Sequence, residues 1–536
     1  MLKLSFTSNK PQKENVPTPS STNPGTAPLD LTLGIEIECL LLRDTRNVDP
    51  TNLTGRQRIH ACLSEPLKAN CSTCGVKHDF GLPLNAVVLD RQAQQEIDTD
   101  YKKWTVDEDP SLGLTPEEAR VLGRDTFVGF DRIEIKSRVL STSQPLITNA
   151  GLHTHTHSVN WDAEIRAVYE HLQDTFNKAP GIPGIRLMVN PSTGTHVHIG
   201  QNHHGFPLDT VKNVLSMYVA NERAIDSMHA ADRIGGSTLA FSKKPTHWLT
   251  GNYTDKCLDD GVFNLPWSAH FQTLAFKISS GHGNLESEFP ANAFNLYSSL
   301  KGDAQQNDVR SWLKVIRFAS NIKDLQNLQN GMGHNSTVNL DNLLDFSAEG
   351  TNRGTGSKKR KMTIEFRQHG ATLRAAEVIA WINVLLKLLT YCHSRSVKDV
   401  KDLCERTWSD PSHNAFKFLT TLGVNPATQR HYTDFLKPND GYAESYLYHR
   451  EDMMWRFGFD FFRPLCQHNL LNHADMLRSG LKENQMKKKL ICGGYGQFEA
   501  KYVSQLDVTA EERTKLTIGW RPDRSGRVDS PVEPAE

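Results

Sequence analysis

Hydrophobic and polar positions alternate strictly in some parts of this chain and recur at helical spacing in others. Residues 31–42 read LTLGIEIECLLL, with apolar side chains at every second position through Cys39. This two-residue alternation predicts a strand with one buried face. Residues 132–140, 195–200 and 362–369 (MTIEFRQH) have the same strand-like texture.

Two segments have apolar residues at every third or fourth position, which is typical of an amphipathic helix. The first runs from Leu208 to Met228 and the second from about Arg374 to His393. A third helix is expected over residues 115–123, where Thr115 precedes Pro116 and two acids. Residues 43–95 contain Pro, Gly and Asn interruptions and are expected to form loops.

Composition divides the chain into a tail, a main domain and an extension. Residues 1–28 are rich in Pro, Ser, Thr and Asn and are expected to be disordered. The main domain is expected at 29–400, with a surface insertion at about 43–100 and a basic, Gly-rich mobile loop at 346–361. A helical extension at 401–520 and a tail at 521–536 complete the chain.

The overall charge excludes several function classes. The 61 basic and 61 acidic side chains give zero net charge, which argues against a nucleic-acid binder with a broad basic face and against a polybasic membrane anchor. The start of the chain lacks the apolar core of a signal peptide, and the apolar run 381–391 is too short to span a bilayer. Nine cysteines are an odd number spread over 536 residues, so we expect an intracellular, reducing environment.

Three of the predicted strands place ionisable side chains two residues apart, and therefore on one face: Glu36 and Glu38; His196 and His198; Glu365, Arg367 and His369. Taken singly, each has an ordinary explanation, such as a solvated strand face, hydrogen-bonded histidines or a surface ion pair. Taken together, these acids and imidazoles suit hard divalent cations, Mg²⁺ or Mn²⁺, bridged by phosphate oxygens. The arginine suits a transferring phosphoryl group, and the absence of cysteine disfavours zinc at this site.

Six segments resemble the amidoligase family, which belongs to the carboxylate–amine ligases related to glutamine synthetase and glutamate–cysteine ligase. In the order of the family they are GIEIE at 34–38, WTVDEDPSL at 104–112, IEIKS at 133–137, GTHVHIG at 194–200, NAFNLYSSL at 292–300 and TIEFRQHGAT at 363–372. The resemblance covers about residues 30–395. It departs from the family pattern at Arg138, where the family usually has proline.

The resemblance implies an α+β fold like the glutamine synthetase catalytic domain, in which a mixed, mostly antiparallel sheet forms a funnel-shaped active site backed by helices. It also implies that ATP phosphorylates a carboxylate and that an amine then displaces phosphate from the acyl phosphate. The implied metal ligands are Glu36, Glu38, Glu134, His196 and Glu365. His198 would contact the nucleotide phosphates, and Arg367 would hold the γ-phosphate.

The resemblance further suggests three substrate contacts, two of which have a plainer alternative. Asp109 lies in a matching segment, although it and Asp107 are equally suited to a turn before Pro110. Arg233 follows the first long helix and is also explained as a solvated charge. Asn295 lies in NAFNLYSSL.

Two further groups of residues have possible metal-binding patterns. Cys71 and Cys74 form a CxxC with Cys62, His60 and His78 nearby, for which we weigh a small zinc loop against free thiols in a surface insertion. His153, His155 and His157 alternate as HTHTH, and the alternatives are a metal-binding strip or a polar loop or edge strand near the site entrance. These three are among the eight histidines between His153 and His204.

The sequence therefore predicts an ATP- and Mg²⁺-dependent ligase that joins a carboxylate to an amine on an amino acid, peptide or protein. Two alternatives stay open. A two-metal phosphohydrolase would use the same acids and histidines, and a catalytically degenerate scaffold would bind nucleotide or partners only. Neither the substrates nor the oligomeric state follow from the sequence.

Overall fold

The computed structural model describes residues 29–44, 51–87, 101–114, 128–148, 157–177, 184–189, 192–201, 205–226, 228–229, 309–329, 336–343, 361–409, 413 and 415–435. The expected helix at 115–123 and the expected tails at 1–28 and 521–536 lie outside these ranges. The same holds for most of the basic loop at 346–361, and for the extension after residue 435.

One antiparallel sheet organises the described part of the chain. Its strands lie in the order β11 (Val338–Asn339), β12 (Thr363–Phe366), β10 (Thr195–Gln201), β1 (Leu31–Asp44), β5 (Val128–Lys136) and β4 (Thr105–Asp107). Two short strands, β6 (Leu140–Ser141) and β9 (Ile185–Met188), also pair with β1. Helices accompany this sheet, so the expected α+β class with a mostly antiparallel sheet is confirmed.

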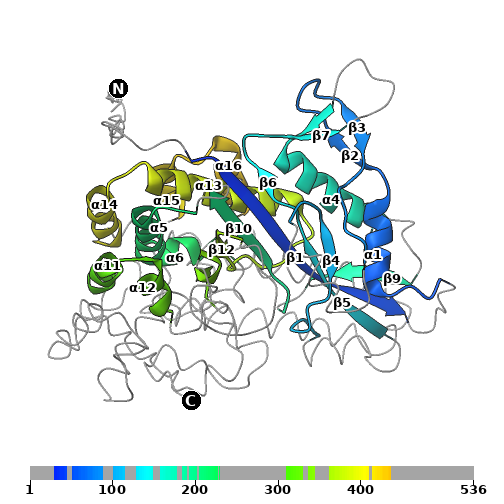
Figure 1. Cartoon of the computed structure of the whole chain (residues 1–536), viewed down its shortest axis with the longest axis horizontal. Coiled ribbons are helices and arrows are strands. Elements are labelled where there is room, and N and C mark those ends of the chain that lie inside the picture. Colours follow the sequence, from blue (N-terminus) through cyan, green and yellow to red (C-terminus); the bar gives the residue numbers. More distant parts are fainter. Residues whose placement is uncertain are drawn as a thin grey trace, which may run out of the picture.

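The alternation in β1 separates an apolar face from a polar one. Ile35 lies opposite Val197 of β10, and Ile37 lies opposite Ile135 of β5. All four side chains are almost completely buried. Since each fully buried aliphatic side chain contributes roughly 1.5–3 kcal/mol, this face anchors the long strand at the centre of the molecule (Figure 1).

Helices cover the core around this sheet. The sheet contacts α13 (Ala375–His393) through β10, and α13 packs against α5 (Leu208–Ala220) and α4 (Trp161–Phe176). Three further helices, α6 (Glu222–Asp226), α11 (Val309–Phe318) and α12 (Ile322–Asn327), contact α5, and the 3-10 helix η6 (Asp341–Leu343) contacts β12. Helix α13 alone among the described helices is long and apolar enough to cross a membrane, but 61% of its apolar window is buried inside the protein. A buried core helix of a soluble protein can have the same length and hydropathy.

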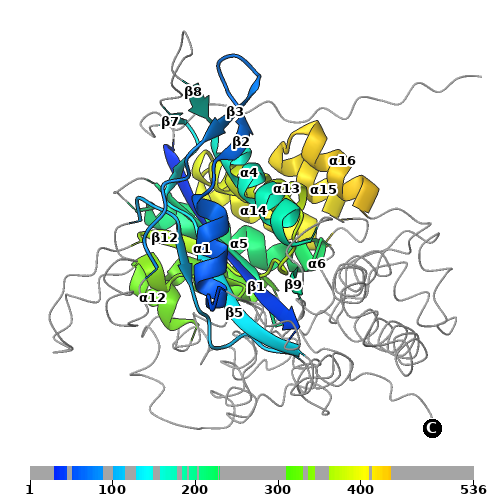
Figure 2. The same ribbon diagram turned by 90° about the vertical axis from the view of Figure 1, so that its right-hand side faces the viewer.

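The helices after residue 396 join the same core. Helix α14 (Val397–Ser409) packs against α5, whereas α15 (Ala415–Leu422) and α16 (Pro426–Phe435) pack against α13. Figure 2 shows α15 and α16 lying together beside the rest of the bundle. The described part of the expected extension is thus helical and contributes apolar side chains to the main core.

The region expected to form loops at 43–95 contains regular structure instead. Helix α1 (Gly55–Ser64) begins at Thr54, whose hydroxyl accepts from the Gln57 backbone while the Gln57 side chain accepts from the Thr54 backbone. This capping box fixes a helix whose apolar pattern is too weak to reveal it. Helix α1 packs against α4 and β5 (Figure 2).

A short hairpin follows α1. It consists of β2 (Leu67–Asn70) and β3 (Lys77–Phe80), and β2 packs against α4. A second hairpin joins β7 (Leu146–Thr148) and β8 (His157–Val159) just before α4 begins. Both hairpins lie outside the main sheet, next to each other in Figures 1 and 2.

Candidate metal centre

The strand register gathers ionisable side chains on the polar face of the sheet. Residues directly opposite one another in an antiparallel pair share a face. Three such pairs are Glu36 with His196, Glu38 with Glu134, and His198 with Glu365. Four strands therefore bring together residues that lie more than 300 positions apart in the sequence.

The first group of possible metal ligands comprises Glu36, His196 and Glu365. Each offers a ligand atom, and these atoms lie within 4.8 Å of one another. The Nδ1 of His196 lies 3.2 Å from Glu36 Oε2 and 3.9 Å from Glu365 Oε1. All three residues are buried.

The second group comprises Glu38, Asp109 and Glu134, whose ligand atoms also lie within 4.8 Å of one another. His196 links the two groups, because its Nε2 lies 3.5 Å from Glu38 Oε1. Asp109 also forms the turn expected of it, since its Oδ1 accepts from the Ser111 backbone at 2.8 Å. Asp109 can therefore form the turn and also lie beside Glu38 and Glu134.

Three cations contact these acids. Lys361 Nζ lies 2.8 Å from Glu36 Oε1, and Lys136 Nζ lies 2.9 Å from Glu134 Oε2. Arg367 donates through Nη1 to Glu365. Arg367 therefore stands where the sequence prediction places it, beside Glu365, while the two lysines balance more of the acidic charge than the sequence analysis anticipates.

His198 lies between the two acids of the first group. Its Nε2 is 3.0 Å from Glu36 Oε1 and 3.8 Å from Glu365 Oε1, and its Nδ1 is 3.3 Å from Thr363 Oγ1. The ring is thus held by groups on the two neighbouring strands, β1 and β12. Its Nε2 lies within reach of anything bound between Glu36 and Glu365.

Burial and neighbouring charges lower the pKa of two of these acids and raise the pKa of a third. Burial opposes ionisation of Glu36, but Lys361 and the nearby histidines outweigh it and hold its pKa well below the usual value. Likewise, burial acts to raise the pKa of Glu365, but the combined effect of Arg367 and the two histidines outweighs it and lowers this pKa to about 2. Burial and the negative charge of Glu36 raise the pKa of Glu134 to about 7, against the effect of Lys136.

His196 is held in its neutral form. Burial and the positive charge of Arg367 lower its pKa to about 4, although Glu36 and Glu365 act in the other direction. A neutral imidazole is the form that binds a metal. If Nε2 carries the proton and donates toward Glu38, the Nδ1 lone pair accepts from Arg367 Nη1 at 3.3 Å and also faces Glu36 and Glu365, where a bound cation would take the place of that hydrogen bond.

Several predicted residues fall elsewhere. Arg233 and Asn295 lie outside the described residues. His369 does not share the face of Glu365 as its spacing predicts, because β12 ends at Phe366. The His369 ring instead packs 5.5 Å from that of His229 and 6.2 Å from that of Trp381.

Some polar groups at this face could not be predicted from the sequence. Asn339 on β11 donates to Glu365 Oε2 at 2.7 Å, but β11 is two residues long and has no detectable pattern. Lys361 was expected to belong to a solvated basic loop. Its ion pair with Glu36 is formed where Met362 adopts φ 49°, the left-handed region that a bulky residue rarely occupies.

The donors fit hard divalent cations. Carboxylate oxygens dominate both groups, and one imidazole lies between them, which is the chemistry of Mg²⁺ or Mn²⁺ sites rather than of zinc sites. The two groups contain five acids, which is more negative charge than the contacting side chains Lys361, Arg367 and Lys136 neutralise. A buried excess of negative charge favours binding of cations.

No protein-family model, no curated protein and no solved structure matches this chain. The site is therefore interpreted from its own geometry.

Proposed function

We propose that this protein is an ATP-dependent carbon–nitrogen ligase, which activates a carboxylate as an acyl phosphate and joins it to an amine. The observation that carries the proposal is the pair of three-residue ligand groups, linked by His196, that lie at one face of the sheet. Side by side, two such groups suit a pair of cations that clamp a polyphosphate. The motif resemblance to amidoligases supports the same reaction.

The residues fit two divalent cations, Mg²⁺ or Mn²⁺. Glu36, His196 and Glu365 would hold one, and Glu38, Asp109 and Glu134 the other. When bound, these ions would neutralise the phosphate oxygens and orient the γ-phosphate for in-line attack.

The chain's own residues would position the reactants. Arg367 is held by Glu365 and presents a fixed guanidinium, a group suited to the charge that develops on a transferring phosphoryl. His198 Nε2 and Lys361 Nζ both lie near Glu36 Oε1 and would contact phosphate oxygens. Phosphoryl transfer to a carboxylate needs such positioning more than it needs a general base.

The polar sheet face would form the floor of a funnel-shaped site like that of glutamine synthetase. Residues Arg233 and Asn295 would contact the carboxylate or amine substrate. Asp109, which was expected to contact substrate, is assigned to the second metal group instead because of its position beside Glu38 and Glu134.

The test is trapping of the acyl phosphate with hydroxylamine, using the full chain, Mg²⁺, ATP and a panel of amino-acid, peptide and protein carboxylates. We expect hydroxamate and ADP to form in equal amounts with at least one carboxylate. Glu36→Gln should abolish both products, because it removes a ligand charge without removing bulk. The matched control is Glu405→Gln, an acid on α14 whose side chain is 38% exposed.

The alternatives give different results. A two-metal phosphohydrolase would release phosphate from esters or ATP without a carboxylate and without hydroxamate. A degenerate scaffold would bind ATP in a manner sensitive to Glu36→Gln but turn nothing over. Either result would contradict the ligase proposal.

A further inference from the structure

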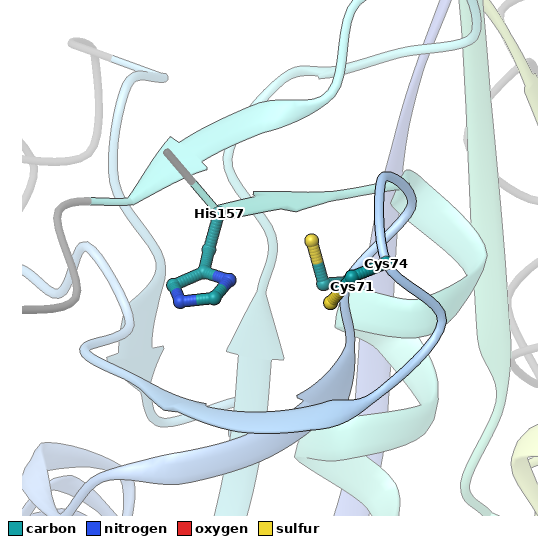
Figure 3. A group of neighbouring side chains, drawn as sticks. All are labelled: Cys71, Cys74 and His157. Atoms are coloured by element: carbon teal, nitrogen blue, oxygen red, sulfur yellow. The ribbon is translucent and has the colours of Figure 1, made fainter. Parts of the chain in front are cut away.

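A second cluster of metal-ligating side chains lies outside the sheet face. Cys71, Cys74 and His157 each offer a ligand atom within 4.8 Å of the others. Figure 3 shows His157 on strand β8 facing the loop that carries both cysteines. The proposed ligase reaction uses none of these residues.

His78 adds a fourth candidate ligand. Its Nε2 lies 3.1 Å from Cys74 Sγ, and its ring centroid lies 3.8 Å from that of His157. In a tetrahedral zinc site, sulfur and nitrogen ligands at the usual bond lengths of about 2.3 and 2.1 Å stand roughly 3.6 Å apart. The ligand atoms of Cys71, Cys74 and His157 are close enough to share one ion, and His78, which lies outside that three-residue group, is the candidate for the fourth position beside Cys74.

The loop between β2 and β3 has the conformation of a metal-binding turn. The backbone N–H of Thr73 points at Cys71 Sγ at 3.4 Å, and Gly75 adopts φ 72° while donating to the Cys71 carbonyl at 2.8 Å. The Cys71 N–H then closes the hairpin on Val76 O at 2.9 Å. This turn directs two thiols that are three positions apart to one side.

His157 comes from a different hairpin, held in place by separate contacts. Ser72 N donates to Ser158 O at 2.7 Å, and Thr73 Oγ1 lies 3.0 Å from Ser158 Oγ. His157 is almost completely buried, with an exposed fraction of 1%, and Cys71 is 2% exposed. The position of the imidazole is thus fixed beside the thiols by backbone contacts.

We propose that Cys71, Cys74, His78 and His157 bind a structural zinc ion that joins the β2–β3 hairpin to the β7–β8 hairpin. The ligand set is Cys₂His₂ with a C-x₂-C-x₃-H spacing followed by a distant histidine. Such soft and borderline donors select zinc, in contrast to the carboxylates of the sheet face. The proposal does not depend on the ligase reaction.

This assignment decides between the alternatives left open by the sequence. Cys62 and His60, which were considered as partners of the CxxC, point elsewhere, since Cys62 Sγ donates to Thr175 Oγ1 at 3.3 Å and His60 Nδ1 lies 3.4 Å from Ser64 Oγ. His157, for which the alternatives were a metal-binding strip with His153 and His155 or a polar loop or edge strand near the site entrance, lies on strand β8 beside the two cysteines. His153 and His155 lie outside the described residues.

The test is metal analysis of the full chain purified with reductant and without chelator. We expect about one zinc per chain, reduced to background in Cys71→Ser and in His157→Ala. Val76→Ala serves as the matched control, because Val76 lies in the same loop with a side chain that is 57% exposed and offers no ligand atom. Cobalt replacement of zinc should produce sulfur-to-cobalt charge-transfer bands and the intense visible bands of tetrahedral cobalt.

The cobalt spectrum also separates this site from the sheet face and from misfolding. Glu36→Gln should leave the sulfur bands unchanged, whereas His78→Ala, which keeps the mutually close Cys71, Cys74 and His157, should shift the visible bands without loss of the fold. The proposal is overturned if the wild-type chain contains no zinc and gives no sulfur bands with cobalt. It is also overturned if His157→Ala retains full zinc, or if Cys71 and Cys74 are recovered as a disulfide.

Discussion

The pKa of Glu134 differs from those of the neighbouring acids, because its contact with Lys136 does not fully offset the effect of burial. Glu36 and Glu365 are kept ionised by Lys361 and Arg367, whereas the pKa of Glu134 rises to about 7 even with Lys136 beside it. In the metal-free protein this acid is therefore protonated over a pH range in which an unfolded chain would ionise it. A divalent cation would reverse that preference.

This difference predicts a pH-dependent stability. As pH rises from about 4.5 to 7, the unfolded chain loses the Glu134 proton before the folded chain does, so this residue lowers the free energy of unfolding progressively until pH 7. Glu134→Gln should therefore stabilise the metal-free protein relative to wild type at pH 8 more than at pH 4.5, by on the order of 3 kcal/mol. Urea unfolding in chelator measures the difference.

Magnesium provides the control for this measurement. Saturating Mg²⁺ should remove the advantage of Glu134→Gln at pH 8, because the ion stabilises the ionised carboxylate of the wild type. An advantage that does not change with pH or with Mg²⁺ would show that Glu134 is no metal ligand and that its charge is not the cause.

Arg367 is the second residue whose chemistry is testable by one substitution. Arg367→Lys keeps the charge but loses the planar guanidinium that Glu365 holds in place. We expect hydroxamate formation to fall by about 10²–10³-fold, as for removal of a donor that stabilises transition-state charge. Steady-state kinetics should place most of the loss in kcat, with a smaller change in KM for ATP.

Arg374→Lys is the matched control, since that side chain is 49% exposed and precedes α13 outside the site. It should change the rate less than twofold. A loss below tenfold in Arg367→Lys would remove Arg367 from the proposed mechanism.

At the scale of elements, helix α4 is tied to the sheet by one buried acid. Glu164 is completely buried and accepts from Arg138 at 3.0 and 2.7 Å and from the Trp104 indole at 2.8 Å. Arg138 stands where the amidoligase pattern usually has proline. In this chain that departure provides the ion pair between the end of β5 and α4.

Substitutions on α4 test this anchor. Glu164→Ala leaves the Arg138 guanidinium and the Trp104 N–H without their buried acceptor, and should lower the free energy of unfolding by about 3–5 kcal/mol. Glu170→Ala on the same helix removes a surface pair with Lys77, with side chains 43% and 56% exposed, and should cost less than about 1 kcal/mol. Equal losses in the two variants, measured by urea unfolding, would contradict the anchoring role.

At the scale of the whole molecule, the sequence predicts which side chains share a face of each strand but not which strands are neighbours. The two-residue alternation identifies β1 and β10 and the residues that project from them, because that period is a local property. Pairing of Glu38 with Glu134, and of His198 with Glu365, depends on the register between distant segments. Only the motif resemblance suggested those groupings in advance.

Residues in irregular segments are harder to predict. Asp109 reaches the second metal group from a turn, and Lys361 reaches Glu36 from a position two residues before β12. Neither position belongs to a periodic pattern of apolar and polar residues. Similarly, the CxxC pattern was visible in the sequence, but its partner His157 is contributed by another hairpin and could not be chosen from the several histidines nearby.

Counting the Mn²⁺ ions bound to the full chain tests the central claim that the sheet face holds two divalent cations. With zinc already present and a non-hydrolysable ATP analogue added, electron paramagnetic resonance should detect two tightly bound Mn²⁺ per chain. Glu365→Gln and Glu38→Gln should each lose one, and Glu405→Gln none. Absence of tight Mn²⁺ binding in the wild type, or two ions retained in both site variants, would contradict the account.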